Sequence, residues 1–135
     1  MHRVTAWRPY LRFPSLFGDR VAFVAEDDIW LSPLGGESTR AWRLTADAAP
    51  VAHARISPDG AHVAFTSRRD GAPEVTVVGT EPGADPARRV TWWGDAFTRV
   101  IGWAADGRVL ATSATGQPFR DDTWAYAVPL DGGSA

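Results

Sequence analysis

Short β-prone runs, separated by tight turns, make up the pattern of apolar and polar positions along this chain. The clearest example is Arg55–Ser67, which is read as strand, turn and strand. Pro58 presets φ at the second turn position, Asp59 can hydrogen-bond its own local backbone, and Gly60 accepts a positive φ at no steric cost. The run Val63–Thr66 that follows is β-prone and mostly apolar, so it predicts the second strand of a hairpin.

This hairpin recurs on both sides of the middle copy. In the run Ile101–Ser113, Asp106-Gly107 falls where Asp59-Gly60 stands in the middle copy. In the first copy the equivalent hairpin turn has a different sequence, Gly18-Asp19. Hairpins that return at a regular spacing predict a repeat protein.

Further matching segments follow each hairpin. The third segments are Asp28–Gly36, Glu74–Gly79 and Thr123–Gly133, and the fourth segments are Arg43-Leu44-Thr45 and Arg89-Val90-Thr91. A period of about 40–47 residues with four short strands per unit is typical of a β-propeller blade. A helical repeat would need an apolar period of about 3.6 residues, and no such run extends beyond a turn or two. We therefore predict an all-β fold of three propeller blades.

The predicted domain organisation follows from these repeats. Residues 1–12 form an N-terminal lead-in, in which Trp7, Tyr10 and Leu11 are expected to pack against the first blade. Residues 13–135 form a partial propeller with blades at about 13–45, 52–92 and 98–133, and the last blade lacks its outer strand. Propellers close with about four to eight blades, so three blades require either the rest of a longer protein or a second copy.

Composition excludes several classes of function. The formal net charge is −2, and the chain has no basic stripe of the kind that binds nucleic acid. No apolar segment is long enough to span a membrane or to serve as a secretory signal. The absence of cysteine excludes disulfides and thiolate metal sites. Neither nucleic acid nor a membrane is therefore expected as a partner.

His53, Ser57 and Asp59 have the residue types of a catalytic triad, which is defined by geometry and roles. Ser57 and Asp59 belong to one turn, and His53 lies a strand-length away. We therefore interpret them as turn residues and a strand histidine, and we expect no catalytic residue in this chain.

Metal sites are also not expected. His53 and His62 lie on different strands of one hairpin, whereas a metal site needs three or four convergent ligands. Glu26-Asp27-Asp28 lacks the spaced acidic ligands and central glycine of a calcium loop, and it is interpreted as a solvated turn, as is Asp121-Asp122. No metal and no other cofactor is predicted.

The tryptophans are assigned mainly to packing. Trp30 and Trp124 stand at equivalent third-strand positions and predict contacts between blades, and Trp103 predicts a core position. Trp92-Trp93 falls between blades and is the best candidate for an exposed aromatic pair, for which ligand contact is the less favoured interpretation.

The innermost strands of a propeller line a central channel. By position these strands lie around Phe13–Leu16, His53–Ile56 and Arg99–Gly102. Arg55 and Arg99 are the candidate channel-lining residues, because a basic lining would attract anionic peptide termini. Only every second residue of a strand faces inward, and the sequence leaves open which ones do.

The opening run Tyr10–Trp30 resembles the beginning of tricorn proteases. Segments further along that resemble the same family are Ser57-Pro58-Asp59-Gly60, Ala64–Ser67, Pro73-Glu74-Val75, Arg89–Gly94, Gly102-Trp103, Asp106–Val109 and Val128–Gly133. The resemblance covers nearly the whole chain from Tyr10. The Ser-Pro-Asp-Gly hairpin is shared with TolB-like and prolyl-oligopeptidase propellers, whereas the opening run is much more specific.

This resemblance implies a function by family. Tricorn proteases are large, hexameric, cytoplasmic serine-type peptidases that trim oligopeptides in proteolysis. Each begins with a six-bladed propeller, and the propellers act as passages for peptides. This chain matches the first half of that propeller, and no residue here corresponds to the family's catalytic residues. The resemblance implies a catalytically inert scaffold and peptide-channel wall that associates with the rest of a tricorn-type peptidase.

Two alternatives remain open. One is a stand-alone protein- or peptide-binding module that closes by homodimerisation into a ring of three plus three blades. The other is a fragment of a TolB-like or prolyl-oligopeptidase propeller. The number of blades is the same in all three interpretations, so it does not separate them.

Overall fold

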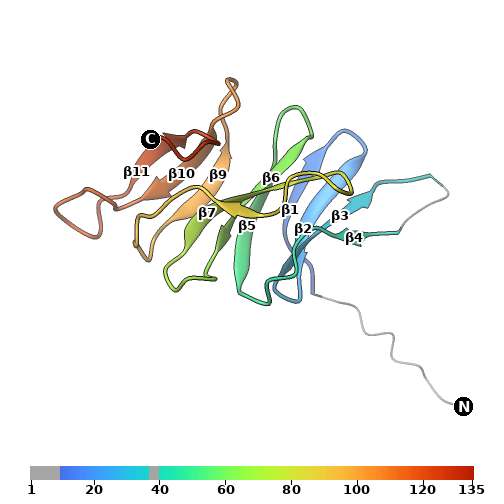
Figure 1. Ribbon diagram of the computed structural model, residues 1–135, viewed down its shortest axis with the longest axis horizontal. Coiled ribbons are helices and arrows are strands. Elements are labelled where there is room, and N and C mark those ends of the chain that lie inside the picture. The colour runs from blue at the N-terminus through green and yellow to red at the C-terminus, as the bar shows by residue number, and fades with distance from the viewer. Residues whose placement is uncertain (1–9, 37–39) are drawn as a thin grey trace, which may run out of the picture.

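The structure is a computed structural model that describes residues 10–36 and 40–135. These residues form three antiparallel sheets that stack one after another (Figure 1). The first sheet contains β1 (Arg12–Phe17), β2 (Arg20–Ala25), β3 (Asp28–Pro33) and β4 (Trp42–Arg43). The second contains β5 (Val51–Ile56), β6 (His62–Ser67), β7 (Glu74–Gly79) and β8 (Arg88–Arg89). The third contains β9 (Arg99–Trp103), β10 (Val109–Ser113) and β11 (Trp124–Val128).

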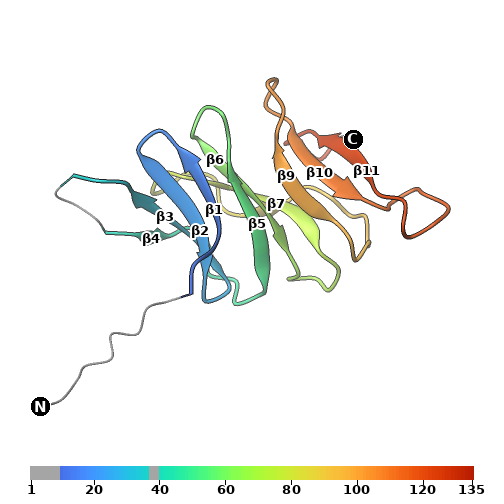
Figure 2. The ribbon, with the colours of Figure 1, turned by 180° about the vertical axis from the view of Figure 1, so that it is seen from behind.

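This architecture confirms the prediction of an all-β propeller fold with three blades. In each sheet the strands follow in chain order, so the hairpin predicted from the turn residues is the inner half of a blade. The first strands β1, β5 and β9 are neighbours across the three sheets (Figure 2). Within the described part of the chain, no helix is long and apolar enough to cross a membrane.

The core consists of two apolar layers, one on each side of the second sheet. Val63 and Phe65 of β6 face the first sheet, where they meet residues such as Leu31. Ala64 of β6 faces the third sheet and packs with residues such as Val109. Because β6 is buried on both faces, its sequence is almost continuously apolar and does not alternate.

The Ser57–Gly60 turn joins β5 to β6 as its residue types predict. The Gly60 N–H donates to the Ser57 carbonyl at 2.9 Å, and the Asp59 carboxylate accepts the Ala61 N–H at 3.0 Å. Gly60 has a φ of +73°, and a Cβ at this position would lie 2.5 Å from the Phe17 ring of β1. Glycine therefore suits the positive φ of this turn, and a Cβ at this position would also have to displace the Phe17 ring.

A cluster of polar groups attaches β8 to β7. Glu74 is buried at the start of β7 and accepts hydrogen bonds from the Thr91 hydroxyl at 2.5 Å and from the Arg89 guanidinium at 3.3 Å. It also accepts the backbone N–H groups of Trp93 at 3.0 Å and of Gly94 at 2.7 Å. The Thr91 hydroxyl in turn accepts the Val75 N–H at 2.9 Å. We call this arrangement of an acid, an arginine and a threonine the blade latch.

The first sheet repeats the blade latch. Asp28 accepts the Thr45 hydroxyl at 2.8 Å and lies 3.6 Å from Arg43, and the Thr45 hydroxyl accepts the Ile29 N–H at 3.0 Å. The prediction that Asp28 is part of a solvated turn is wrong, because this latch buries its carboxylate. The exposed turn consists of Glu26-Asp27, whose φ angles of 50° and 61° are typical of a two-residue hairpin turn.

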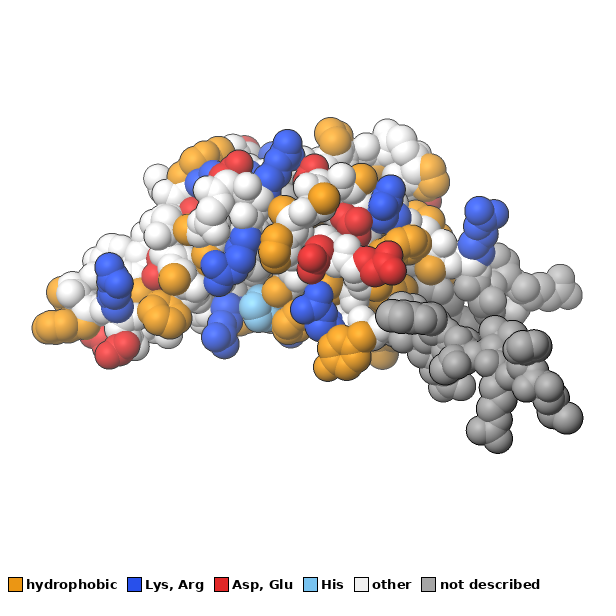
Figure 3. Space-filling view, turned by 90° about the horizontal axis from the view of Figure 1, so that it is seen from below, with side chains coloured by type: hydrophobic (Ala, Val, Ile, Leu, Met, Phe, Trp, Pro, Cys, Tyr) orange, Lys and Arg blue, Asp and Glu red, His pale blue; other side chains and the backbone are white. Residues whose placement is uncertain are grey.

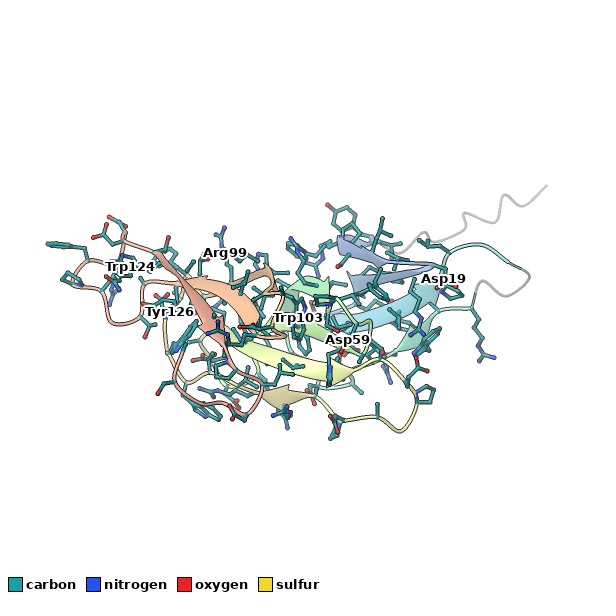
Figure 4. All side chains as sticks on the ribbon, turned by 90° about the horizontal axis from the view of Figure 1, so that it is seen from above. Asp19, Asp59, Arg99, Trp103, Trp124 and Tyr126 are labelled. Carbon is teal, nitrogen blue, oxygen red and sulfur yellow. The ribbon has the colours of Figure 1, made fainter. Side chains whose placement is uncertain are left out.

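Packing predictions for other aromatic residues have mixed outcomes. Trp103 packs against the second apolar layer and donates its indole N–H to the Arg55 carbonyl at 2.9 Å. Trp124 is 61% exposed, so among the described residues its predicted contact with another blade is wrong. It is the first residue of β11 and follows an exposed loop. Figure 4 shows Trp124 at the end of the molecule away from the first sheet.

The lead-in is only partly described. Tyr10 and Leu11 are both exposed, so the prediction that they pack against the first blade is wrong. Trp7, the third residue of that prediction, lies outside the described residues.

Candidate functional site

The inner strands form a basic pocket on one face of the molecule. It has a volume of about 270 Å³ and lies where β1, β5 and β9 begin. Its principal lining residues are Arg12, Phe13, His53, Thr66, Arg68 and Arg99. Figure 3 shows a histidine among several basic side chains on the face seen from below.

Three arginines give this pocket its charge. Arg12 lies 3.5 Å from the exposed carboxylate of Asp27. Among the described residues, neither Arg68 nor Arg99 has an acidic side chain within ion-pair distance. The guanidinium groups are therefore available to a carboxylate or another anion, for which arginine offers a fork of N–H donors.

Phe13 and His53 form the inner wall of the basic pocket. Each has a positive φ, 51° for Phe13 and 57° for His53, and each lies where the pairing of its inner strand is irregular. Their ring centroids are 4.7 Å apart at an interplanar angle of 53°. Positive φ is uncommon outside glycine, and here it rotates both rings toward one another.

His53 is held in its neutral form. Burial is the main cause that lowers its pKa below 6.5, and the charges of Arg99 and Arg55 lower the pKa further. Its Nδ1 atom is buried and has no hydrogen-bond partner among the described residues. An anion in the pocket would offset the two arginine charges and make protonation of His53 easier.

Acidification is expected to destabilise the protein through His53. Because the folded state has the lower pKa, the unfolded chain takes up a proton first as the pH falls below about 6.5. Stability should therefore fall as the pH is lowered through the range below about 6.5, and H53Q should reduce that dependence. Urea unfolding of both proteins across this range measures the effect. A wild-type chain whose stability rises on acidification through this range would contradict it.

The two predicted channel-lining arginines have different surroundings. Arg99 lines the basic pocket. Arg55 is absent from its lining, and its guanidinium donates to the Ala54 carbonyl at 2.8 Å. Sequence reasoning missed Arg12 and Arg68, although both stand at ends of strands that the repeat identifies.

The residues that resemble a catalytic triad are not brought together. The Ser57 hydroxyl donates to Asp59 at 2.5 Å, which is the main cause that lowers the pKa of that carboxyl. Both residues line a separate pocket that His53 does not line. The Ser57 hydroxyl also accepts the His62 N–H at 3.0 Å, so its contacts are those of a turn.

The two histidines of the β5-β6 hairpin also lie apart. His53 lines the basic pocket, and His62 Nε2 lies 3.8 Å from the exposed carboxylate of Asp85. Asp121 and Asp122 are exposed in the loop before β11. Within residues 10–36 and 40–135, no cluster of three or more acidic or histidine side chains could hold a metal ion.

The Trp92-Trp93 pair is divided between two environments. Trp92 is 66% exposed, and the Arg89 guanidinium lies 5.3 Å from its ring centroid. Trp93 packs against Tyr126, with ring centroids 5.0 Å apart. Of this pair, Trp92 is therefore the exposed aromatic residue.

Comparison with known proteins identifies relatives over nearly the whole chain. The family model of the tricorn protease N-terminal β-propeller domain matches residues 8–135. Tricorn protease homolog 1 of Streptomyces coelicolor is 60% identical over 126 residues, which is 93% of this chain and 11% of that protein. The chain thus spans about a tenth of the length of that relative.

Two further relatives agree with this match. A putative tricorn-like protease N-terminal subunit of Sulfurisphaera tokodaii is 27% identical, over 97% of this chain and 66% of that protein. The crystal structure of the tricorn protease superposes with a TM-score of 0.79 at 28% identity, over 92% of this chain and 13% of that one.

Proposed function

The chain belongs to the family of tricorn protease N-terminal β-propellers, and on this premise we propose that it supplies half of a peptide-channel wall. In this proposal residues 13–135 are one partial propeller after a lead-in over 1–12, and they contribute scaffold but no catalytic residue. Peptides pass along the inner strands, and the remainder of a tricorn-type peptidase cleaves them. The proposed location is the cytoplasm.

The observation that carries this proposal is the position of the basic pocket on the inner strands. A channel for peptides must accept their terminal carboxylates, and Arg68 and Arg99 present guanidinium groups without acidic partners among the described residues. A site on the stacked inner strands would face the axis of a closed ring. The relative named as an N-terminal subunit supports association with the rest of a peptidase.

The proposal is tested with a short peptide that has either a free C-terminal carboxylate or a C-terminal amide. The free carboxylate should bind weakly, and R99Q should weaken this binding by about threefold to tenfold, because one charged hydrogen bond is lost. R108Q is the matched control, since Arg108 is 2.8 Å from Asp106 on its own turn. Chemical-shift titration measures both affinities. Equal binding of the two peptides, or no effect of R99Q, would refute the proposal.

A second candidate function is a self-associating binding module of three plus three blades. The observation that favours it is the exposure of apolar residues at both ends of the stack, with Leu16 at 69% in the first sheet and Ile101 at 48% in the third. Two copies would cover both ends in one two-fold ring. The solution mass of the chain tests it directly. The third interpretation, a TolB-like or prolyl-oligopeptidase fragment, is set aside because of the family match.

A further inference from the structure

His53 offers one ring nitrogen to a molecule in the basic pocket. Its Nδ1 atom is buried and has no hydrogen-bond partner among the described residues. His53 itself is only half-buried and lines the pocket, so Nε2 is the nitrogen that reaches this space. A neutral imidazole carries one N–H donor, and a buried N–H without an acceptor is rare in proteins. The single ring proton of neutral His53 therefore belongs on Nε2, where it faces the pocket.

The backbone around His53 holds the ring in this position. His53 has a φ of 57°, and the pairing of β5 with β6 is irregular between Ala52 and Arg55. Its ring packs against that of Phe13, with centroids 4.7 Å apart. A positive φ outside glycine costs free energy and persists where the surrounding structure holds it, commonly at functional sites. These features fix a hydrogen-bond donor in the wall of the pocket.

His53 is surrounded by positive charge. The other charged side chains that line the basic pocket are Arg12, Arg68 and Arg99. Arg55, on the same strand as His53, adds its charge to theirs. Arginine groups from β1, β5, β9 and the end of β6 thus all oppose a positive charge on this histidine.

The acidic side chains near the pocket have other partners. The exposed carboxylate of Asp27 lies 3.5 Å from Arg12. Asp95, which precedes the lining residue Ala96, accepts the Ser113 hydroxyl and the Ala114 N–H, each at 2.8 Å. No acidic side chain of the described residues lines the pocket itself. An anion bound among the arginines would therefore be the negative charge that favours protonation of His53.

We propose that His53 binds a peptide carboxylate together with Arg99 and takes up a proton from solvent as the carboxylate binds. The Nε2–H group donates to the carboxylate, and the added proton resides on Nδ1. Because Nδ1 has no acceptor among the described residues, this protonation costs free energy, which the negative charge of the bound carboxylate offsets. The inference rests on the proposed function, in which the basic pocket accepts the C-terminal carboxylate of a peptide.

Proton uptake makes the affinity of the pocket depend on pH. Without a carboxylate, burial and then the charges of Arg99 and Arg55 hold the pKa of His53 below 6.5. A bound carboxylate raises that pKa, so the bound form holds the proton up to a higher pH than the free form. Affinity for the carboxylate should therefore rise as the pH is lowered through the range below about 6.5.

Chemical-shift titration with N-acetylated trialanine tests this coupling. The α-carboxyl group has a pKa of about 3.5 and the acetylated amine does not titrate, so the ligand keeps its charge at about pH 7.5 and at about pH 5.5. The wild-type chain should bind this peptide at least about threefold more tightly at the lower pH, since a shift of one pKa unit corresponds to a factor of about ten.

H53N should remove the titration and keep the local structure. Asparagine retains an N–H donor and is among the residues that adopt a positive φ more readily. This variant should still bind the peptide, with an affinity that changes less than about twofold between the two pH values. H62Q is the matched control, because His62 lies beside Asp85 and lines a separate pocket. It should keep the wild-type dependence.

The imidazole resonances of the wild-type chain give a second measurement that needs no variant. The chain has three histidines, and the contact with the Phe13 ring identifies the resonance of His53. With saturating peptide the pKa of the His53 ring should rise relative to the free protein. A ring with a purely structural role would show no such rise.

The outcomes separate this inference from the proposed function. Tighter binding on acidification in the wild type and in H62Q but not in H53N, with a raised pKa of His53, supports proton uptake. Binding that is specific for the carboxylate but equal at both pH values, or that changes equally in H53N, overturns the role of His53 and leaves the carboxylate site intact. Equal binding of the peptide and its C-terminal amide would refute the site and, with it, the role of His53.

Discussion

Replacing Glu74 with leucine is expected to lower the free energy of unfolding by about 3–5 kcal/mol. Glu74 is 3% exposed and accepts hydrogen bonds from Thr91, Arg89, Trp93 and Gly94. Leucine has a similar volume but accepts none of them, so two backbone N–H groups lose their acceptor and the Arg89 guanidinium loses one of its acceptors. Removing one member of a buried charged cluster costs more than the cluster contributes, because the other members stay desolvated.

Urea unfolding followed by circular dichroism measures this loss. E74Q keeps an acceptor oxygen and should retain part of the stability, so it remains informative if E74L does not fold. E81Q is the matched control, because Glu81 has a side chain that is 63% exposed and pairs with Arg20 at the surface. That change should cost less than about 1 kcal/mol. A loss for E74L no greater than for E81Q would show that the blade latch contributes little.

Replacing Phe65 with alanine should cost about 3–5 kcal/mol. Phe65 is 1% exposed and lies in the layer between the first and second sheets. Its deletion removes buried apolar surface and leaves a cavity that β-sheets on both sides cannot close without moving. Because the layer joins two blades, the loss weakens the contact between sheets as well as the second sheet itself.

The matched control for Phe65 is Phe119, which is 68% exposed in the loop before β11. F119A should change the free energy of unfolding by less than about 0.5 kcal/mol. The same urea titrations measure both variants. Equal losses for F65A and F119A would contradict the assignment of Phe65 to the core.

The blade architecture could be predicted because its signals are local. Turn residues such as Asp59-Gly60 and Asp106-Gly107 act on their own backbone, so their recurrence reveals the hairpins without knowledge of distant contacts. The burial of Asp28 could not be predicted in the same way. Its partner Thr45 follows β4, 17 residues further along the chain, and acidic residues beside a turn are usually solvated.

The basic pocket was predictable only in part. Position on the innermost strands makes Arg55 and Arg99 candidates, and a choice between them needs strand alternation, which assumes a regular strand. The pairing of β5 shifts between Ala52 and Arg55, which interrupts that alternation. The cause is the positive φ of His53. The residues around His53 in the sequence give no signal that predicts a positive φ there.

Among the described residues β11 pairs with β10 alone, so the strand that covers its other edge affects both assembly and solubility. Charged residues and prolines commonly protect edge strands from indiscriminate pairing, and the segment Trp124–Val128 contains neither. Whichever strand covers this edge therefore also acts as its gatekeeper against aggregation. Chains whose β11 edge is unpaired are the most prone to aggregate. The yield of soluble protein should therefore depend on the strand that pairs with this edge.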